Sequence, residues 1–292
     1  MKWIVLVLIY GILKGIRDVS KKKALEKNGV TEVLFVYTLI AFCLVLPDVR
    51  NAGGVAARDL LLTAFKSFVI FIAFLCGFIA IDKMPIGIYG IVDLSRMVFS
   101  LILGVIILKE TMGFNQYLGM ALVIIGLLLL KYIPVFMNGK GNFKIRDKEK
   151  TVLSAWILVV AFISTFLNAV SGILDKILMR TMTSSQLQFW YMLFMLVYYG
   201  LYVLISRTKI DWKSVLKNPH VWLIAALFII ADRCLFLANG DPASKVTVMT
   251  ILKQICVIVT IVGGRIVFKE KNMGYKIFCA LVVSAGVVIS AL

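Results

Sequence analysis

The sequence predicts an all-α membrane protein whose ten transmembrane helices form two inverted five-helix repeats. Three observations support this fold class. First, 61% of the 292 residues are hydrophobic, and apolar runs of about 20 residues, long enough to cross a bilayer as a helix, recur along the chain. Second, a polar stretch at the midpoint separates five such runs from five others. Third, short motifs of the first group recur in the same order in the second.

Ten hydrophobic segments follow one another with mostly short connections. They cover residues 3–20, 30–46, 60–81, 85–108, 115–132, 152–178, 185–205, 221–238, 243–268 and 275–292. Pro85 and Pro242 stand at the first turn of the fourth and ninth segments, where a missing amide N–H costs nothing, and Asp241 is placed to cap the ninth. The first segment has no A-x-A-like cleavage site and similar helices follow it, so we interpret it as a retained helix and not as a signal peptide.

The polar stretch NGKGNFKIRDKEK at residues 138–150 divides the chain. It is too short and too charged to be a domain, so we assign residues 1–132 to a first repeat, 133–150 to a linker and 151–292 to a second repeat. The matching motifs are GIRD (15–18) with GILD (172–175), GVIILKE (104–110) with GRIVFKE (264–270), and ALVIIG (121–126) with ALVVSAG (280–286), the last pair with one insertion. Two similar halves with an odd number of helices each must lie in the membrane with opposite orientations.

The formal net charge of +17 would suggest nucleic-acid binding in a soluble chain, but here the basic residues concentrate in short loops. In that position they retain loops in the cytoplasm and attract anionic lipid, so we expect a lipid bilayer as partner and no nucleic acid. The basic connections follow the first, third, fifth, seventh and ninth segments, and the positive-inside rule therefore predicts both termini outside. They include Lys21, Lys22, Lys23, Lys27, Lys209, Lys213 and Lys217.

Sequence signatures of metal sites and of catalysis are missing from the chain. The five cysteines lie inside apolar runs, and their odd number without a CxxC motif indicates neither a disulfide framework nor a zinc site. The only histidine, His220, lies beside Pro219 in a basic loop, without an HExxH motif or a Ser–His arrangement. We therefore expect no metal, no cofactor and no enzyme, although a membrane-embedded enzyme stays the alternative from another functional class. Because no nucleotide-binding loop is present, transport would be secondary and not driven by ATP.

Features of both halves carry a family resemblance. The fourth and ninth segments each start at a proline, and Glu110 and Glu270 close them. In this arrangement the chain resembles the drug/metabolite transporter superfamily, in its ten-helix EamA-type branch, which usually has Gly-Glu where this chain has Lys-Glu. The resemblance implies a central cavity lined by helices 1, 3, 4, 6, 8 and 9, and transport by alternating access. It also implies cytoplasmic termini, opposite to the loop-charge count.

We assign ten charged residues of the hydrophobic segments to the membrane interior. At about 2.5–3.5 kcal/mol each on insertion scales, they would together cost on the order of 30 kcal/mol in lipid, whereas native proteins are stable by only about 5–15 kcal/mol. They must therefore face one another or a water-filled cavity. The set comprises Lys14, Arg17, Asp18, Lys66, Asp93, Arg96, Asp175, Asp232, Arg233 and Lys253.

From these residues we select a candidate substrate-binding set, in which helical spacing places Lys14 with Asp18 (i,i+4) and Asp93 with Arg96 (i,i+3) on shared faces. The offset of the repeats places Lys253 opposite Asp93 in the second copy. Purely structural salt bridges remain the alternative reading, and an aspartate that relays a proton or cation (Asp18, Asp93 or Asp175) is also open. The set is Lys14, Asp18, Asp93, Arg96, Asp175, Arg233, Lys253 and Gln254.

Together these features predict a multi-pass plasma-membrane protein that moves a small polar metabolite by alternating access. Six intramembrane bases against four acids leave a positive surplus, which favours an anionic substrate. A coupling proton or ion is a further expected partner. A flippase for a lipid-linked anionic headgroup is the alternative that the same charges would also suit.

Overall fold

The computed structural model describes residues 2–108, 113–138, 155–241, 244, 249, 252–253, 255–270 and 273–289. Within these residues every regular element is a helix, which confirms the all-α class. Five of the described helical spans are long and apolar enough to cross a membrane by length and composition: Val30–Asn51, Ala57–Lys83, Ala155–Leu178, Ser184–Ser206 and Pro219–Gly240.

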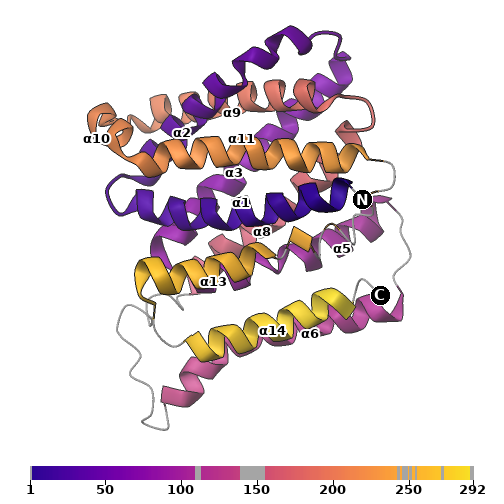
Figure 1. Ribbon diagram of the computed structural model, residues 1–292, viewed down its shortest axis with the longest axis vertical. Coiled ribbons are helices and arrows are strands. Elements are labelled where there is room, and N and C mark those ends of the chain that lie inside the picture. The colour runs from indigo at the N-terminus through magenta and orange to yellow at the C-terminus, as the bar shows by residue number, and fades with distance from the viewer. Residues whose placement is uncertain are drawn as a thin grey trace.

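Helices of the first half are α1 (Lys2–Leu25), α2 (Val30–Val45), the short 3₁₀ helix η1 (Leu46–Asn51), α3 (Ala57–Lys83), α4 (Ile86–Asp93), α5 (Arg96–Leu108) and α6 (Phe114–Asn138). Those of the second half are α8 (Ala155–Leu178), α9 (Ser184–Ser206), α10 (Trp212–Lys217), α11 (Pro219–Gly240), α13 (Ile255–Phe268) and α14 (Met273–Ile289). The long helices lie side by side in one elongated bundle (Figure 1).

The two halves interleave in this bundle. Helix α1 packs against α11 and α13 of the second half, and α8 packs correspondingly against α3 and α5 of the first. Helices α6 and α14 pair at one edge of the bundle, and α2 pairs with α9. Each half therefore buries its apolar helix faces mainly against the other half, and the charged residues of α1 face helices from both.

Local sequence explains where several helices begin. Thr183 and Gln186 form a capping box at the start of α9, in which each side chain accepts a hydrogen bond from the other residue's backbone N–H. The Asn218 side chain caps α11, and Pro219 occupies the first helical position. Asp241 ends α11 as its C-cap, and Pro242, at which the next helix was expected to start, lies outside the described residues.

Helix α1 is longer than the sequence suggested. The hydrophobic segment ended at Ser20, but the helix continues to Leu25. Lys21, Lys22 and Lys23, which we expected in a cytoplasmic connection, therefore belong to the helix, and Lys21 is buried. The prediction was wrong because hydrophobicity marks where lipid ends, whereas the extra turn is stabilised by contacts of its lysines with other helices.

The fourth segment is also not one continuous helix. Helix α4 ends at Asp93 and α5 begins at Arg96, and the N–H groups of Leu94, Ser95 and Met97 each bond to the carbonyl three residues before them. Such i→i−3 bonds form a tighter, 3₁₀-like turn, which in mid-helix often marks a hinge. Pro85 precedes α4 in an extended conformation (φ −56°, ψ 138°) as its N-cap, and does not occupy the first helical turn as expected.

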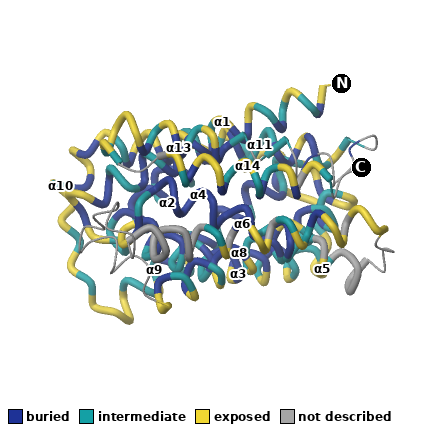
Figure 2. The backbone as a smooth tube through the Cα atoms, turned by 90° about the horizontal axis from the view of Figure 1, so that it is seen from below, coloured by how far each residue is buried: buried dark blue, intermediate teal, exposed yellow. Residues whose placement is uncertain are grey.

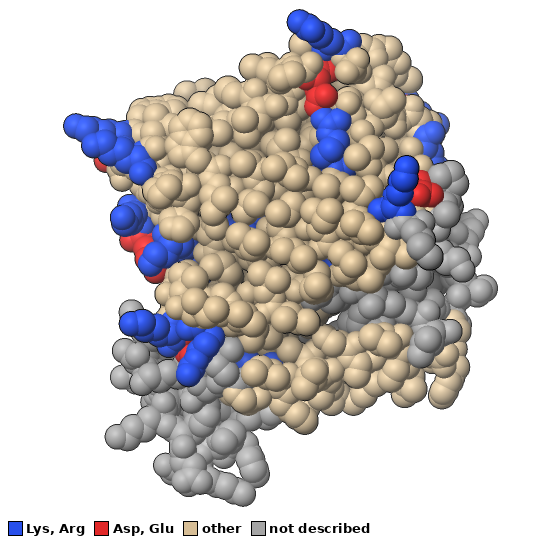
Figure 3. Space-filling model, viewed as in Figure 1, with Lys and Arg blue, Asp and Glu red and all other residues tan. Residues whose placement is uncertain are grey.

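Exposed and buried residues separate as expected for a protein in lipid. Helix α4 runs through the middle of the bundle, where all eight of its residues are buried (Figure 2). In Figure 3 the middle of the face over α1, α11 and α13 is almost free of charged side chains, which lie mainly along the edges. An apolar face of this kind suits hydrocarbon, and charged edges suit the headgroup regions.

Candidate functional site

Close packing brings α4 against both α13 and α1. A Cβ atom added at Gly90 would lie 2.2 Å from the Thr260 hydroxyl oxygen on α13, so a residue without a side chain permits the contact. On α1, a Cβ atom at Gly15 would lie 2.6 Å from Val259 of α13. These contacts hold α1, α4 and α13 together at the level of Asp93, the last residue of α4.

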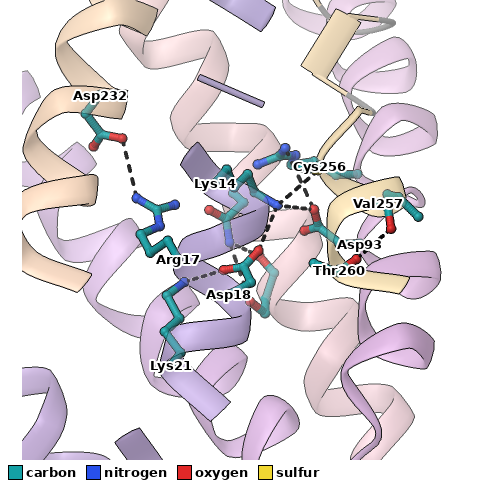
Figure 4. A network of polar contacts seen from close by, with 12 residues as sticks. Lys14, Arg17, Asp18, Lys21, Asp93, Asp232, Cys256, Val257 and Thr260 are labelled. Carbon is teal, nitrogen blue, oxygen red and sulfur yellow. Dashed lines mark hydrogen bonds and ion pairs between the residues drawn. The ribbon is translucent and has the colours of Figure 1, made fainter. Parts of the chain in front are cut away.

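Five charged residues from α1, α4 and α5 meet there, and we call them the Lys14 cluster: Lys14, Asp18, Lys21, Asp93 and Arg96. Figure 4 labels the first four of them. The Lys14 ammonium donates to the Asp93 carboxylate at 2.5 Å and to the Asp18 carboxylate at 3.3 Å, and lies 3.8 Å from the sulfur of Cys256. Arg96 lies 3.9 Å from the Asp93 carboxylate. Both short-range pairs that the helical spacing predicted therefore form, and Lys14 links them.

Lys21 is a member of the cluster that the sequence reasoning missed. Its ammonium lies 2.7 Å from the Asp18 carboxylate on the same helix and over the faces of Phe74 and Phe78 of α3. The i,i+3 spacing from Asp18 was available as a signal. Lys21 follows the end of the hydrophobic run, so hydrophobicity alone places it in a loop.

A second charged contact joins α1 to α11. The Arg17 guanidinium is 4% exposed, and its Nη1 lies 3.8 Å from the Asp232 carboxylate. The guanidinium carbon lies 5.0 Å from the centre of the Phe228 ring. Neither residue belonged to the candidate set, although both were among the ten intramembrane charges.

Asp175 lies away from the Lys14 cluster, on α8. Its carboxylate is 2.7 Å from the ammonium of Lys66 on α3, which also lies 3.7 Å from the Tyr191 ring centre and 5.0 Å from that of Phe236. Lys66 is 1% exposed. This pair ties the two halves together through a carboxylate, an ammonium and two aromatic faces, and it leaves the ammonium no free side.

The remaining predicted residues do not reach the Lys14 cluster. Arg233 extends toward the edge of the bundle, where it bonds the Asp48 carboxylate of η1 and donates to the Ser185 hydroxyl at 2.7 Å. Lys253 lies 5.7 Å from the Tyr10 ring centre, and no carboxylate of the described residues lies within 4.0 Å of its ammonium, so it does not pair with Asp93. Gln254 lies outside the described residues.

The Lys14 cluster borders a small polar cavity. Its walls also include Arg17, residues of α3 such as Gly77, and Ser164 and Asn168 of α8. The free space of about 20 Å³ admits about one water molecule, so the described form is too closed for a metabolite. Four cationic side chains (Lys14, Arg17, Lys21 and Arg96) and two carboxylates (Asp18 and Asp93) line it. The cavity is therefore positively charged.

Glu270 joins the helix ends at the margin of the site. Its carboxylate accepts hydrogen bonds from the Ile86 N–H, at the start of α4 (2.7 Å), and from the Lys276 ammonium (2.8 Å). A carboxylate at a helix N-terminus satisfies an unpaired donor and complements the helix dipole. The residue that closes the ninth segment thus caps the first half's central helix. Its counterpart in the repeat, Glu110, lies outside the described residues.

Metal-binding chemistry finds no support in the described part of the chain. No group of three or more His, Cys, Asp or Glu side chains there could hold a metal ion, and the five cysteines are free thiols. What the Lys14 cluster can do is hold an anion. Arginine and lysine donors in a low-dielectric cavity form strong charge-assisted bonds to oxyanions.

Comparison with known proteins agrees with this fold. No curated protein matches the chain in sequence. Solved structures do match it: among 22 such chains, one, described only as the crystal structure of a protein, has a TM-score of 0.57 at 11% sequence identity, over 97% of this chain and 95% of its own length. At that identity the likeness shows the fold alone.

A family model matches the part of the chain that carries the Lys14 cluster. It is the model of the EamA-like transporter family, and it covers residues 1–132. Members of this family are transporters and not enzymes. The chain is thus an integral membrane protein whose first 132 residues match the EamA-like transporter family, which is part of the drug/metabolite transporter superfamily.

Proposed function

We propose that the chain is a secondary transporter that moves a small anionic metabolite across the plasma membrane by alternating access. The observation that carries the proposal is the charge of the central cavity, which four cationic side chains and only two carboxylates line. Asp232 faces Arg17 from beside the cavity, so four cations meet three carboxylates, and the remaining positive charge is unfavourable at a buried site. An anionic substrate would supply the missing negative charge.

The packing of the helices supports an inverted-repeat architecture with residues 1–132 and 151–292 as halves and 133–150 as linker, although residues 133–138 of that linker continue helix α6. Exchanging the halves maps α1 onto α8 and α3 onto α11, and both the α1–α11 and the α3–α8 contacts are extensive. Ion pairs cross both contacts, Arg17 with Asp232 and Lys66 with Asp175. A cavity between two such halves can open to either side by rocking one half against the other.

The closed cavity and the kinked fourth helix support a cycle with an occluded state. A site for a metabolite needs some hundreds of Å³, far more than the described cavity offers. The 3₁₀-like turn between α4 and α5 lies directly at Asp93 and Arg96, so straightening or bending it would move both side chains. We propose that the described form is the occluded state and that this turn is a hinge.

Substrate class is tested by thermal unfolding of the purified, detergent-solubilised protein with a panel of carboxylates, sugar phosphates, neutral sugars and organic amines. A ligand at 100 times its dissociation constant stabilises the native state by about 2.7 kcal/mol. We expect carboxylates or sugar phosphates to raise the melting temperature, and then to be taken up by proteoliposomes. Stabilisation by amines or neutral sugars alone would refute the anionic assignment.

Substitutions of cavity residues test whether uptake depends on the cavity. Replacing Arg96, which lines the cavity, by glutamine should abolish uptake and leave folded protein, and Arg58→Gln, an exposed arginine at the start of α3, is the matched control. Wild-type uptake by Arg96→Gln would remove this residue from the transport site. A lipid-linked anionic headgroup has the same chemistry, so a flippase assay with a labelled anionic lipid distinguishes lipid translocation from metabolite uptake.

A further inference from the structure

Among the described residues that line the cavity, Arg17 alone has buried side-chain nitrogen atoms without a hydrogen-bond partner. It is 4% exposed, yet its Nε and Nη1 atoms have no hydrogen-bond partner among the described residues. The Asp232 carboxylate lies 3.8 Å from Nη1, too far for a hydrogen bond. By contrast, Lys14 and Lys21 have carboxylate oxygens at 2.5 and 2.7 Å. The lysines are therefore occupied, whereas Arg17 has donors to spare.

The surroundings of Arg17 hold its guanidinium in place without using these donors. The group lies over the ring of Phe228, which is 1% exposed and packs edge-to-face with Tyr37 and Phe74. This contact with an aromatic ring uses no hydrogen bond, so the N–H groups at the edges of the guanidinium stay available as donors. Those edges suit two oxygen atoms of one carboxylate or phosphate. Buried donors without partners are otherwise rare and costly.

We propose that Arg17 binds the oxyanion group of the substrate and that Asp232 is an internal counter-anion which the substrate displaces. The inference rests on the proposed anion transport and names the residue that recognises the charged group. In the empty, closed form, Asp232 balances the charge of Arg17 from 3.8 Å without hydrogen bonding to it. A carboxylate or phosphate entering the widened cavity would form the hydrogen bonds that Asp232 does not.

The proposal gives the two partners opposite effects on anion binding, which a structural salt bridge would not do. Removing the charge of Asp232 eliminates a competitor, so anion affinity should rise. Removing the guanidinium of Arg17 eliminates the group that recognises the anion, so anion affinity should fall. If the pair merely joined α1 to α11, both changes would loosen the site and weaken binding.

The test is a thermal-unfolding titration of the full-length protein in detergent, with inorganic phosphate and succinate as probes and tetramethylammonium chloride as the cation control. Asp232→Asn should lower the apparent dissociation constant for the better probe at least about fivefold, the lower end of ordinary coupling between sites. Arg17→Gln and Arg17→Lys should raise it by about tenfold or more, as expected for loss of charge-assisted hydrogen bonds. Asp48→Asn is the matched control, because it removes the carboxylate facing Arg233 outside the cavity, and it should leave the constant unchanged.

If Arg17→Gln does not fold, the double variant Arg17→Gln/Asp232→Asn removes both charges together, and it should fold but lose its anion response. Suppose that Asp232→Asn binds the anion no more tightly than the wild type, while Arg96→Gln loses binding. This result would overturn the role of Arg17 and Asp232 and leave the proposed transport intact. Absence of any stabilisation of the wild-type protein by phosphate or succinate would overturn both.

Discussion

Replacing Lys14 should show how much of the fold depends on the Lys14 cluster. The Lys14 ammonium is 6% exposed and bridges two carboxylates, Asp93 at 2.5 Å and Asp18 at 3.3 Å. In Lys14→Gln, the Asp18 carboxylate still has the Lys21 ammonium as a cationic partner at 2.7 Å, but the Asp93 carboxylate has only Arg96, at 3.9 Å. The change therefore leaves one buried carboxylate without a close cation.

Removing one partner of a buried ion pair costs about 3–5 kcal/mol, and we assign that range to Lys14→Gln. At about 2–4 °C for each kcal/mol in a chain of this size, the melting temperature should fall by roughly 10 °C. Lys21→Gln is the matched control, because Asp18 then keeps Lys14 at 3.3 Å. It should lose only a charged hydrogen bond, about 1.5–3 kcal/mol.

The double variant Lys14→Met/Asp93→Leu separates folding from function. Replacing both members of a buried pair by apolar residues is often neutral for stability, so this protein should melt near the wild-type temperature. It should nevertheless show no anion-dependent stabilisation and no uptake. The assay is thermal unfolding in detergent followed by proteoliposome uptake. Comparing the wild type, Lys14→Met, Asp93→Leu and the double variant in a double-mutant cycle gives the coupling energy between the two residues.

Two results would refute the reasoning. A loss below about 1 kcal/mol in Lys14→Gln, the value typical of an exposed pair, would mean that Lys14 does not bridge buried carboxylates. Wild-type uptake by Lys14→Met/Asp93→Leu would mean that the bridge only holds helices together.

Further substitutions test the helix contacts around α4. Gly90→Ala should lower the melting temperature, because the added Cβ would lie 2.2 Å from a hydroxyl oxygen of α13. The added Cβ of Gly172→Ala meets nothing within 4 Å, so this variant should raise stability by about 0.5–1 kcal/mol. Equal effects of the two variants would contradict the described packing. Glu270→Ala should cost about 3–5 kcal/mol, because it leaves Lys276, which is 1% exposed, without its carboxylate. The control Glu26→Ala breaks an exposed pair and should cost less than about 1 kcal/mol in the same melt.

Sequence reasoning worked best where the interaction is local. Lys14 and Asp18 lie one helical turn apart and meet at 3.3 Å, and Asp93 and Arg96 lie within 3.9 Å. Spacing on one helix fixes such neighbours before any tertiary structure forms. The same rule would have found Lys21 beside Asp18. It did not, because the end of the hydrophobic run was mistaken for the end of the helix.

Reasoning from the repeat was less reliable. The offset between the halves placed Lys253 opposite Asp93, but equivalent positions in two repeats need not touch. Helix α1 supplies the partner instead: Lys14 reaches Asp93 across 79 residues of sequence. Likewise Asp232 and Arg233 are adjacent in sequence, yet successive helical residues point about 100° apart. Asp232 therefore faces Arg17, and Arg233 faces Asp48 at the edge.

The sequence by itself determined that this chain is helical, lies in a membrane and carries charges that must be buried together. Those conclusions follow from the length of apolar runs and from the cost of a charge in hydrocarbon, which are properties of each segment alone. The tertiary structure decided which charges meet, where the fourth helix bends, and that Arg17 keeps unused donors in a positively charged cavity. These depend on how helices far apart in the chain rotate and pack against each other, which segment-by-segment hydrophobicity does not encode.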